Sequence, residues 1–451
     1  MDFLENSELF KRPRGATSYK AKKQSIDVSI VDTLRDIKAQ TKGQRCCTCI
    51  KNFACLFIVF LIIAISIFLS IYVLMLDNAI DSCSTSFKYG APTSFKFENH
   101  SIEAVSLLLG VSMVQITQTD FDAITLNYTF TGSSKAAIAE MTPLVPTLVP
   151  TADGDLQLDV QYMTLFEVHQ CNQILLELGV PRKWPIPLRI NVTTPGSVTI
   201  TGVTSSVGYL IVNNREFGTG AVMIHGCALA TLEVTTLSGS ITVYETRLAG
   251  VDTPSGFDEA LLSLRSEYGT VVLSTFSGPE ADVTIQMPGT SRGSISISDS
   301  SMRTLNIQGG SSVTLTAVVV DNRLKVVGTA ATTLLSVSMC ATRVLDVTTV
   351  EGGPISAYVS NSTAEVAMMM TTGTGKQVVS LPTLCNGKYS LETTTGPEPV
   401  VAGAIFQSTT SQAKLKEGII KGASTSASCP NVEVTLTSAS GAIKLQSMDA
   451  K

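Results

Sequence analysis

The segment Leu305-Asn-Ile307 is the first of four copies of one pattern, followed by Leu324-Lys-Val326, Leu345-Asp-Val347 and Ala364-Glu-Val366. The copies begin 19, 21 and 19 residues apart. Alternation of apolar and polar residues is typical of a strand that is buried on one side. One such unit cannot bury its apolar side alone, whereas stacked units share a continuous core. The repeat therefore predicts a β-solenoid with about 20 residues per turn.

A second apolar triplet accompanies the first in many units. It occurs as Val271-Val-Leu273, Ile295-Ser-Ile297, Val313-Thr-Leu315 and Leu335-Ser-Val337. Outlying copies begin at Gly196, Gly239 and Gly441. We expect two short strands in each turn and a solenoid that extends over residues 191–451. A meander of hairpins packed as sandwiches is the alternative explanation for alternating strands and turns.

Residues 53–76 contain no charge and lie between Lys51 and Asp77. At about 1.5 Å per residue, a helix of this length would cross a bilayer core of ~30 Å. Of the net charge of −5, residues 1–52 carry +5 (11 Lys/Arg, 6 Asp/Glu) and the remainder −10 (21 and 31). Basic residues beside a span stay in the cytoplasm. The sequence therefore predicts one transmembrane helix in a type II, signal-anchor arrangement, with a cytosolic N-terminus and an extracellular or luminal body.

Residues 1–52 are polar and charged, without sustained apolar periodicity, which predicts a disordered basic cytosolic tail. Three cysteines, Cys46, Cys47 and Cys49, stand directly before the apolar run. Cysteines beside a membrane are candidates for reversible palmitoylation.

Residues 77–190 are expected to form a β-rich domain next to the membrane. Strand patterns cover Thr93–Phe97, Ala123–Phe130 and Leu156–Val160, and Thr164–Leu178 has the apolar spacing of a helix. The strand pattern over Phe121–Phe130, the proline-bounded middle over Pro143–Pro150 and the pattern over Leu156–Val160 resemble the β-sandwich of late-embryogenesis-abundant proteins. This resemblance implies a small antiparallel sandwich that binds lipid or acts as a spacer.

The Gly-Ser-Ile-Thr-Val segment at Gly239–Val243 and its copies resemble the repeats of the putative-adhesin family of β-solenoid proteins. This resemblance implies a surface or adhesive scaffold. The succession of a short tail, one span and a β-helical body is also similar to the layout of the sarcoglycans, although their terminal cysteine-rich module is missing here.

Covalent modification of the body is predicted at two kinds of residue. Asn-x-Ser/Thr glycosylation sites occur at Asn99, Asn127, Asn191 and Asn361. The cysteines beyond the apolar run are disulfide candidates in an oxidising compartment: Cys83, Cys171, Cys227, Cys340, Cys385 and Cys429. Fifteen pairings are possible. We favour Cys385 with Cys429, and buried free thiols are the alternative.

No combination of residues in the sequence indicates catalysis, a cofactor or a metal site. Five acidic residues are spaced so that neighbouring turns could bring them together: Asp282, Asp299, Asp321, Asp346 and Glu365. Because the repeats alternate apolar and polar positions, we expect these carboxylates to face solvent and to oppose strand addition. The histidines His100, His169 and His225 lack the spacing of metal ligands. The acidic body also argues against nucleic-acid binding.

These features favour a structural or adhesive membrane glycoprotein whose solenoid binds a glycan, matrix or a protein partner. The alternative is a lipid-handling or tethering protein of an endosomal or vacuolar membrane, with residues 77–190 as the active part. The ligand and the oligomeric state are left open by the sequence.

Overall fold

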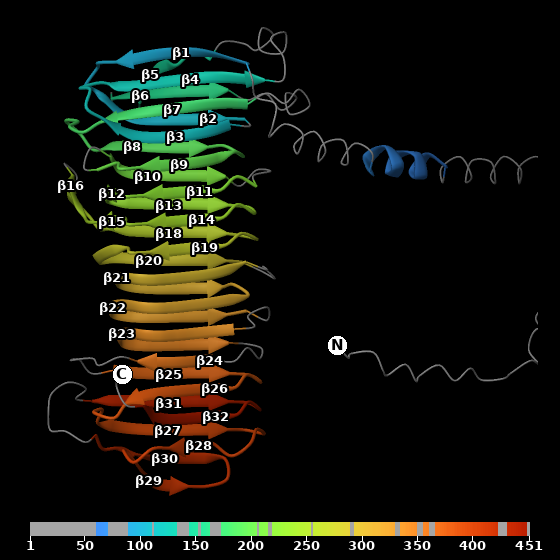
Figure 1. Cartoon of the computed structure of the whole chain (residues 1–451), viewed down its shortest axis with the longest axis vertical. Coiled ribbons are helices and arrows are strands. Elements are labelled where there is room, and N and C mark those ends of the chain that lie inside the picture. The colour runs from blue at the N-terminus through green and yellow to red at the C-terminus, as the bar shows by residue number, and fades with distance from the viewer. Residues whose placement is uncertain are drawn as a thin grey trace, which may run out of the picture. The chain divides into compact units, whose positions relative to one another are not determined.

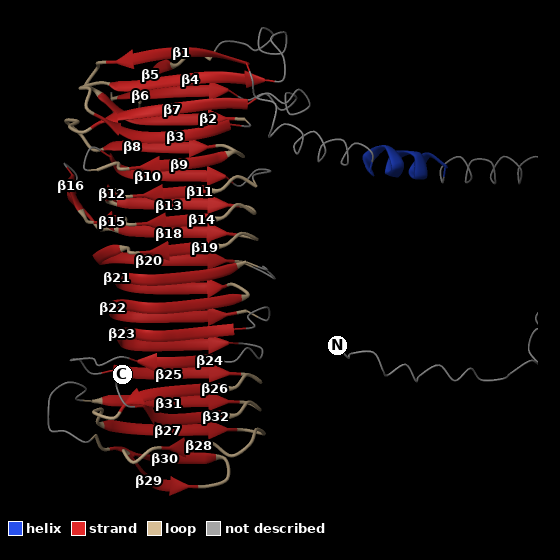
Figure 2. Cartoon of the chain, in the orientation of Figure 1, coloured by secondary structure: helices blue, strands red, loops and turns tan. Residues whose placement is uncertain are grey.

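A computed structural model of the chain describes residues 60–70, 89–110, 112–132, 144–151, 155–162, 173–204, 207–214, 219–253, 256–288, 293–329, 334–349, 355–359, 366–422 and 431–448. The chain divides into two compact units, Met1–Asn78 and Ala79–Lys451. The second unit is built of strands, whereas the described part of the first is one helix (Figure 2).

The helix of the first unit covers residues 60–70. Among the described residues there is no helix that is both long and apolar enough to cross a membrane. The prediction of a transmembrane helix over residues 53–76 is therefore wrong. The type II signal-anchor arrangement and the single-pass membrane localisation derived from it are wrong as well.

The second unit contains two stacks of strands with a shared interior (Figure 1). We name them sheet 1 and sheet 2, although their ladders join into one 30-stranded sheet. In spatial order, sheet 1 consists of β5 (Thr147–Pro150), β6 (Leu156–Tyr162), β2 (Ile102–Leu109), β8 (Leu188–Thr193), β10 (Val207–Asn214), β13 (Thr231–Thr236), β18 (Leu261–Ser266), β20 (Ser277–Met287), β21 (Ser294–Gly309), β22 (Ser312–Gly328), β23 (Leu334–Thr349), β25 (Val366–Thr372), β31 (Val432–Ser438), β27 (Gly387–Thr393), β30 (Leu415–Ile420) and β29 (Phe406–Ser411).

Sheet 2 lies opposite sheet 1. Its strands are β1 (Tyr89–Phe97), β4 (Ile124–Gly132), β7 (Gln173–Pro181), β3 (Ser112–Thr119), β9 (Ser197–Thr201), β11 (Val222–His225), β14 (Ile241–Tyr244), β19 (Val271–Ser274), the first parts of β21, β22 and β23, then β24 (Ile355–Val359), β26 (Gln377–Pro382), β32 (Ile443–Met448) and β28 (Val400–Ala402).

A short third side connects the two sheets within a turn. It contains β12 (Ala228–Leu229) and β15 (Arg247–Leu248), and the long strands β21, β22 and β23 bend through it. A small hairpin, β16 (Val251–Thr253) with β17 (Gly256–Asp258), interrupts the turn that follows β15. The turns from β12 to β23 therefore have three sides, where the sequence predicted two strands.

Apolar columns along the stack form the core. Ile297 of β21 pairs with Leu315 of β22, which pairs with Val337 of β23, and all three are at most 1% exposed. The second predicted triplet is therefore confirmed as one inward column of sheet 2, and the outlying copies after Gly196, Gly239 and Gly441 belong to the same column. Burying each such side chain contributes about 1.5–3 kcal/mol.

The first predicted triplet is confirmed in sheet 1 for three of its four copies. Leu305 pairs with Leu324, and Leu324 with Leu345. The fourth copy is wrong because Leu345 pairs with Met368 and not with Ala364. This turn is longer than the one before it, since β25 begins only at Val366.

The predicted helix over Thr164–Leu178 is wrong where the structure describes it. Residues 173–178 belong to β7, and Ile174, Leu176 and Leu178 are buried on one side of this strand. β7 pairs with β3 and β4, so neighbouring strands satisfy its backbone groups.

The described part of residues 77–190 continues the same stack. Leu107 of β2 pairs with Val192 of β8, and Val114 of β3 pairs with Val198 of β9. The expectation of a separate sandwich next to a membrane is therefore wrong. Strand order is not sequential here, because β6 and β7 lie on the outer side of β2 and β3. The antiparallel strands β1, β4 and β5 close this end.

The other end of the stack has the same kind of inversion. β31 and β32 come last in the chain, yet β31 lies between β25 and β27, and β32 lies between β26 and β28. The antiparallel strands β30 and β29 close this end. Antiparallel closing strands limit the addition of further parallel strands to the ends of the stack.

A buried hydroxyl and a glycine form the corner between sheet 1 and the next strand of sheet 2. The Gly269 amide donates to Ser266 Oγ at 2.9 Å, and the Gly441 amide donates to Ser438 Oγ at 2.8 Å. A Cβ at Gly269 would lie 2.1 Å from the Gly239 carbonyl oxygen of the preceding turn. The corner therefore requires glycine for close backbone approach.

The opposite corner uses a left-handed residue after β9, β11, β14, β19 and the first parts of β21 and β22. Gly202 and Gly226 occupy it with φ of 66° and 64°, but Glu245, Thr275, Asp299 and Ala317 follow in later turns with φ of 47° to 54°. A left-handed conformation costs an L-residue roughly 1–2 kcal/mol, and β-branched residues tolerate it poorly.

We expect Thr275→Gly to stabilise the protein by about 0.5–1 kcal/mol, because relief of the left-handed strain exceeds the added entropy of the unfolded chain. Thr275 is exposed, so little packing is lost. Denaturant unfolding of the full chain measures the change. As a control, Thr242→Gly on β14, where φ is not positive, should destabilise. Equal destabilisation by both substitutions would contradict the expectation.

Candidate functional site: the uncharged face of sheet 2

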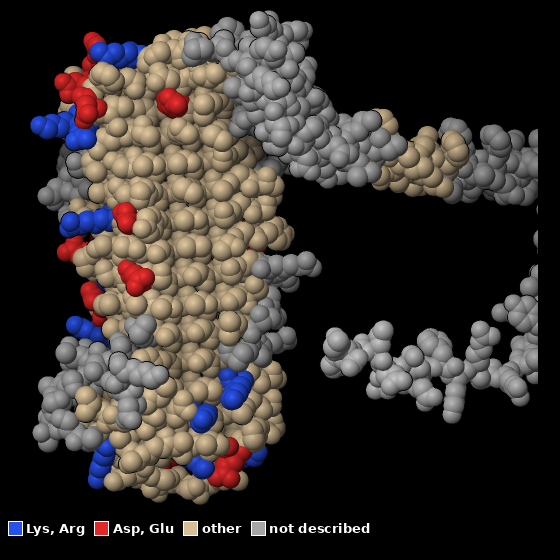
Figure 3. Space-filling model, viewed as in Figure 1, with Lys and Arg blue, Asp and Glu red and all other residues tan. Residues whose placement is uncertain are grey.

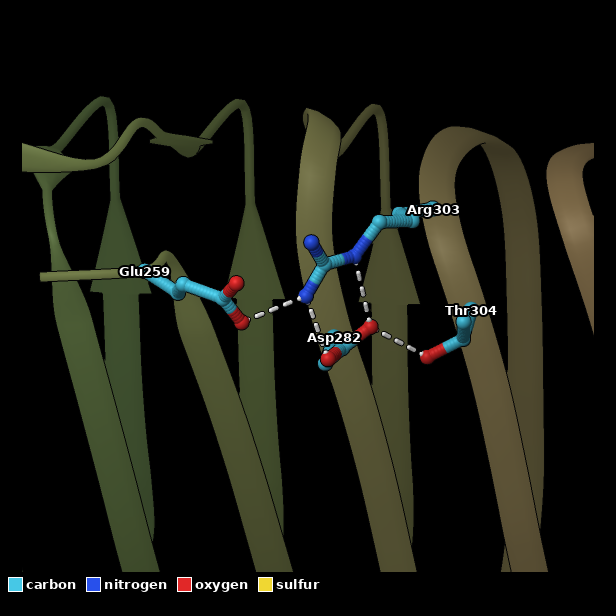
Figure 4. A network of polar contacts seen from close by, with 4 residues as sticks. All are labelled: Glu259, Asp282, Arg303 and Thr304. Atoms are coloured by element: carbon cyan, nitrogen blue, oxygen red, sulfur yellow. Dashed lines mark hydrogen bonds and ion pairs between the residues drawn. The ribbon is translucent and has the colours of Figure 1, made fainter.

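The predicted carboxylates of sheet 1 lie in ion pairs. Asp282 receives two hydrogen bonds from Arg303, Nε to Oδ1 at 3.0 Å and a terminal nitrogen to Oδ2 at 2.6 Å. The same guanidinium reaches Glu259 at 2.8 Å, and Thr304 Oγ1 donates to Asp282 at 2.6 Å (Figure 4). These contacts join three successive turns. The hydrogen bonds from Arg303 hold the pKa of Asp282 below its usual value.

The remaining carboxylates do not complete a catalytic pair. Asp346 is bound by Arg323 at 2.5 Å. Asp299 occupies a left-handed corner and Asp321 is exposed, whereas Glu365 lies outside the described residues. Asp282 and Asp346 thus each lie in an ion pair with an arginine of a neighbouring turn.

We expect Asp282→Asn to cost about 0.5–1 kcal/mol at pH 7, because the pair is partly exposed and solvent screens it. The folded-state pKa of Asp282 is lowered, so its contribution exists above the unfolded pKa and disappears as pH falls through the folded pKa. The free energy of unfolding of Asp282→Asn should differ from that of the parent protein at pH 7 and should equal it near pH 2. The exposed Asp122→Asn is the control, and a difference that persists at low pH would refute the expectation.

The outward side of sheet 2 carries small uncharged side chains over ten neighbouring strands, from β3 to β26. We call this surface the hydroxyl face. Two central outward columns define it: Gln115, Thr199, Met223, Thr242, Val272, Ser296, Thr314, Ser336, Ser356 and Val378, beside Thr117, Thr201, His225, Tyr244, Ser274, Ser298, Thr316, Ser338, Tyr358 and Ser380.

Charges occur at the two ends of these columns. Glu177 of β7 precedes Gln115, and Lys444 of β32 follows Val378. At a spacing of about 4.8 Å per strand, the ten strands extend ~43 Å. Figure 3 shows a face of this unit on which uncharged residues form a broad area. Most of the Lys, Arg, Asp and Glu lie along one edge and near the lower end, and a few acidic residues lie within the area. The hydroxyl face is thus a flat, regular surface without net charge.

One cluster interrupts the small side chains of the hydroxyl face. The His225 and Tyr244 rings are stacked, with centroids 5.1 Å apart and planes 16° apart. The Glu245 carboxylate lies 3.1 Å from His225 Nε2. Hydrogen bonds with Tyr244, the larger cause, and with His225 lower the pKa of the Glu245 carboxyl. The hydrogen bond with Glu245 raises the pKa of the Tyr244 hydroxyl. The side chains of His225 and Glu245 are 43% and 48% exposed, and Tyr244 is 40% exposed.

An open hollow of about 300 Å³ lies at the β1 end of sheet 2. Its lining includes Thr93, Ser94, Asn127 and Glu177. Ser94 Oγ donates to Asn127 Oδ1 at 2.7 Å. The lining is mixed, because Tyr128 and Leu175 also contribute to it, and the hollow is open to solvent.

The predicted glycosylation sites Asn99, Asn127 and Asn191 are exposed, and Asn361 lies outside the described residues. Exposure is compatible with glycosylation, which stays a prediction. The palmitoylation candidates Cys46, Cys47 and Cys49 also fall outside the part that the structure describes.

Two of the disulfide candidates are buried free thiols, so that prediction is wrong for Cys227 and Cys340. Burial raises the pKa of both thiols, to about 11 for Cys340. Cys227 follows β11 and Cys340 belongs to β23, five strands further along sheet 2. Five steps span about 24 Å, far beyond the Cα separation of a disulfide.

Cys385 is buried and disulfide-bonded, and its partner lies outside the described residues, as do Cys83, Cys171 and Cys429. The Gly422 amide donates to Asn386 Oδ1, and the Val432 amide donates to the Asn386 carbonyl. The chain on both sides of residues 423–430 therefore lies beside Cys385. This proximity agrees with the pairing to Cys429, which stays a prediction.

The other histidine that the structure describes, His100, packs against Trp184 with ring centroids 5.0 Å apart and planes tilted by 52°, and His169 is not described. Within the described ranges, no group of three or more His, Cys, Asp or Glu could hold a metal ion. Sequence reasoning treated His225 as structural and missed Glu245. A non-glycine residue at a corner where earlier turns use glycine was the available signal.

Comparisons with known proteins add little. No family model and no curated protein matches the chain. A "putative cell adhesion protein" from Clostridium sporogenes is 11% identical, covers 80% of this chain and 100% of its own, and has a TM-score of 0.16. A "putative lipid binding protein" from Parabacteroides distasonis is 10% identical, covers 79% and 97%, and has a TM-score of 0.28. Such TM-scores carry no argument about function.

Proposed function

We propose that this chain is a non-catalytic adhesive scaffold that binds matrix or glycan material through the hydroxyl face. The observation that carries the proposal is the register of its small polar side chains. Thr314, Ser336 and Ser356 occupy equivalent positions on successive strands, as do Thr316 and Ser338. A repeating partner can therefore meet the same donors and acceptors at every step.

Repetition supports binding through avidity. A hydroxyl donates one hydrogen bond and accepts others, and each solvent-exposed contact is individually weak. Many weak contacts on one rigid surface act together, because the first contact raises the effective concentration of the others. The rigid core under the face keeps the hydroxyls in place and reduces the entropy cost of binding.

A catalytic function has less support than adhesion. The carboxylates Asp282 and Asp346 are bound by arginines of neighbouring turns, and both belong to sheet 1. The lipid-handling alternative is likewise less well supported, because the hollow near Asn127 is open to solvent and its lining includes the Glu177 carboxylate.

The test compares charge insertion on the two sheets of the full-length protein. Ser296→Lys with Thr314→Lys places two charges on the hydroxyl face, whereas Thr284→Lys with Asn306→Lys places two charges on sheet 1. We expect sedimentation with cell-wall and matrix polysaccharides to fall about tenfold or more for the first pair only. Equal binding by both double variants, or turnover of a polysaccharide by the parent protein, would overturn the proposal.

A further inference from the structure

We propose that Tyr244, Glu245 and Ser274 form a sugar subsite on the hydroxyl face for a neutral glycan. This inference rests on the adhesive function proposed above and names the partner class. The adhesive function involves the whole hydroxyl face. The present inference assigns sugar recognition to this one cluster, and the rest of the face contributes weaker contacts.

The geometry of the stacked rings provides a ring face for a ligand. His225 and Tyr244 are ladder partners on adjacent strands. Their 5.1 Å centroid separation is close to the ~4.8 Å spacing of strands, so the rings stack along the ladder. The next partner of Tyr244 is Ser274. Because serine is small, the Tyr244 ring face on that side lies beside a space about one strand wide.

Ser274 and Ser298 form the floor of this space. Their hydroxyls are 3.0 Å apart in a mutual hydrogen bond, and both lie on the second column of the hydroxyl face. A pyranose ring presents C–H groups on its faces and hydroxyls at its rim. Its face can therefore pack on Tyr244 while its rim hydroxyls meet the serine hydroxyls.

Glu245 supplies a carboxylate at the edge of the stack. Its hydrogen bonds to His225 and Tyr244 position the group, and its side chain is still 48% exposed. A carboxylate has about four acceptor sites, so some remain for the hydroxyls of a sugar. Glu245 adopts a left-handed φ of 48° at a corner where Gly202 and Gly226 show that glycine fits.

The charge of the hydroxyl face indicates which class of glycan it can bind. Apart from His225 and the Glu245 corner, the outward columns from Gln115 to Ser380 contain no ionisable acid or base other than tyrosine. No cluster of basic residues lies on them to bind sulfate or uronate groups, and the carboxylates at the Glu245 and Asp299 corners repel an anionic chain. The surface therefore fits a neutral, hydroxyl-rich polysaccharide.

The experiment measures binding of the full chain to immobilised neutral polysaccharides, namely β-1,4-glucan, β-1,3-glucan, chitin and mannan, with alginate as the anionic comparison. We expect Tyr244→Ser to weaken binding to the preferred neutral chain about 10-fold. Serine fits this position, since Ser274 and Ser298 follow in register. Tyr244→Phe keeps the ring and should stay within about threefold of the parent. Tyr209→Ser on sheet 1 is the matched control, expected to bind like the parent.

A second readout separates contact from altered folding. With labelled histidine, the bound polysaccharide should shift the His225 resonance, assigned through His225→Thr, and leave that of His100 unchanged. If the parent binds and Tyr244→Ser binds equally well, the subsite is refuted and the adhesive function stands. If the parent binds no polysaccharide and no matrix material, both are refuted. Preference for alginate refutes the neutral-glycan assignment.

Discussion

Removal of residues 431–451 should abolish cooperative folding of the stack and lead to aggregation. These residues contain β31 and β32, which lie between earlier turns. Five of their side chains are at most 1% exposed: Val432, Val434, Leu436, Ile443 and Leu445. Their burial contributes on the order of 10 kcal/mol, comparable to the whole stability of a typical domain. The deletion would also separate β27 and β28 from the stack and uncover parallel strand edges.

A point variant tests the same claim without shortening the chain. Leu436 is fully buried between its partners Met370 and Leu391. Leu436→Asp should cost more than about 4 kcal/mol, because the carboxylate is buried without a partner. Thr435→Asp on the outward side of the same strand should cost less than about 1 kcal/mol. Thermal unfolding and light scattering measure both. A truncated chain that stays monomeric with unchanged unfolding would show that β31 and β32 are dispensable.

Gly269→Ala should destabilise the stack by about 2–4 kcal/mol, the next largest effect that we expect. The added Cβ would lie 2.1 Å from the Gly239 carbonyl oxygen and 2.8 Å from Ser266 Oγ. The Gly239 carbonyl accepts a hydrogen bond from Thr236 Oγ1 at 2.9 Å and cannot move away without loss of this bond, so the turns must separate locally. Denaturant unfolding measures the cost.

Gly202→Ala is the matched control, because it separates steric from conformational effects. Nothing lies within 4 Å of a Cβ at Gly202, but its φ is +66°. The left-handed conformation alone should cost about 1–2 kcal/mol there. If Gly269→Ala costs no more than Gly202→Ala, the close approach of successive corners does not limit the choice of residue.

Much of the core could be predicted because strand alternation is a local signal. Leu315 and Val337 were assigned correctly, since an inward residue follows an outward one wherever a strand is buried on one side. The helix predicted near Leu175 failed for the opposite reason. Its leucines fit two periodicities, and pairing with β3 and β4 decided between them.

The candidate site was only partly predictable. Polar positions between the apolar ones follow from the repeat, so the sequence implied Ser and Thr on an outer face. The stack of His225 on Tyr244 depends on ladder partners that are 19 residues apart, and the place of Glu245 depends on a left-handed corner. Neither is encoded in a local period.

By itself, the sequence determined that the body is a stacked β-structure with a shared aliphatic core. The reason is that alternation and repeat length are properties of neighbouring residues along the chain. Tertiary structure alone decided the order of the turns at both ends, the pairing of Asp282 with Arg303 and the continuous charge-free face of sheet 2. These features arise from residues brought together by strand register, and register depends on the competition among all strands for the same partners.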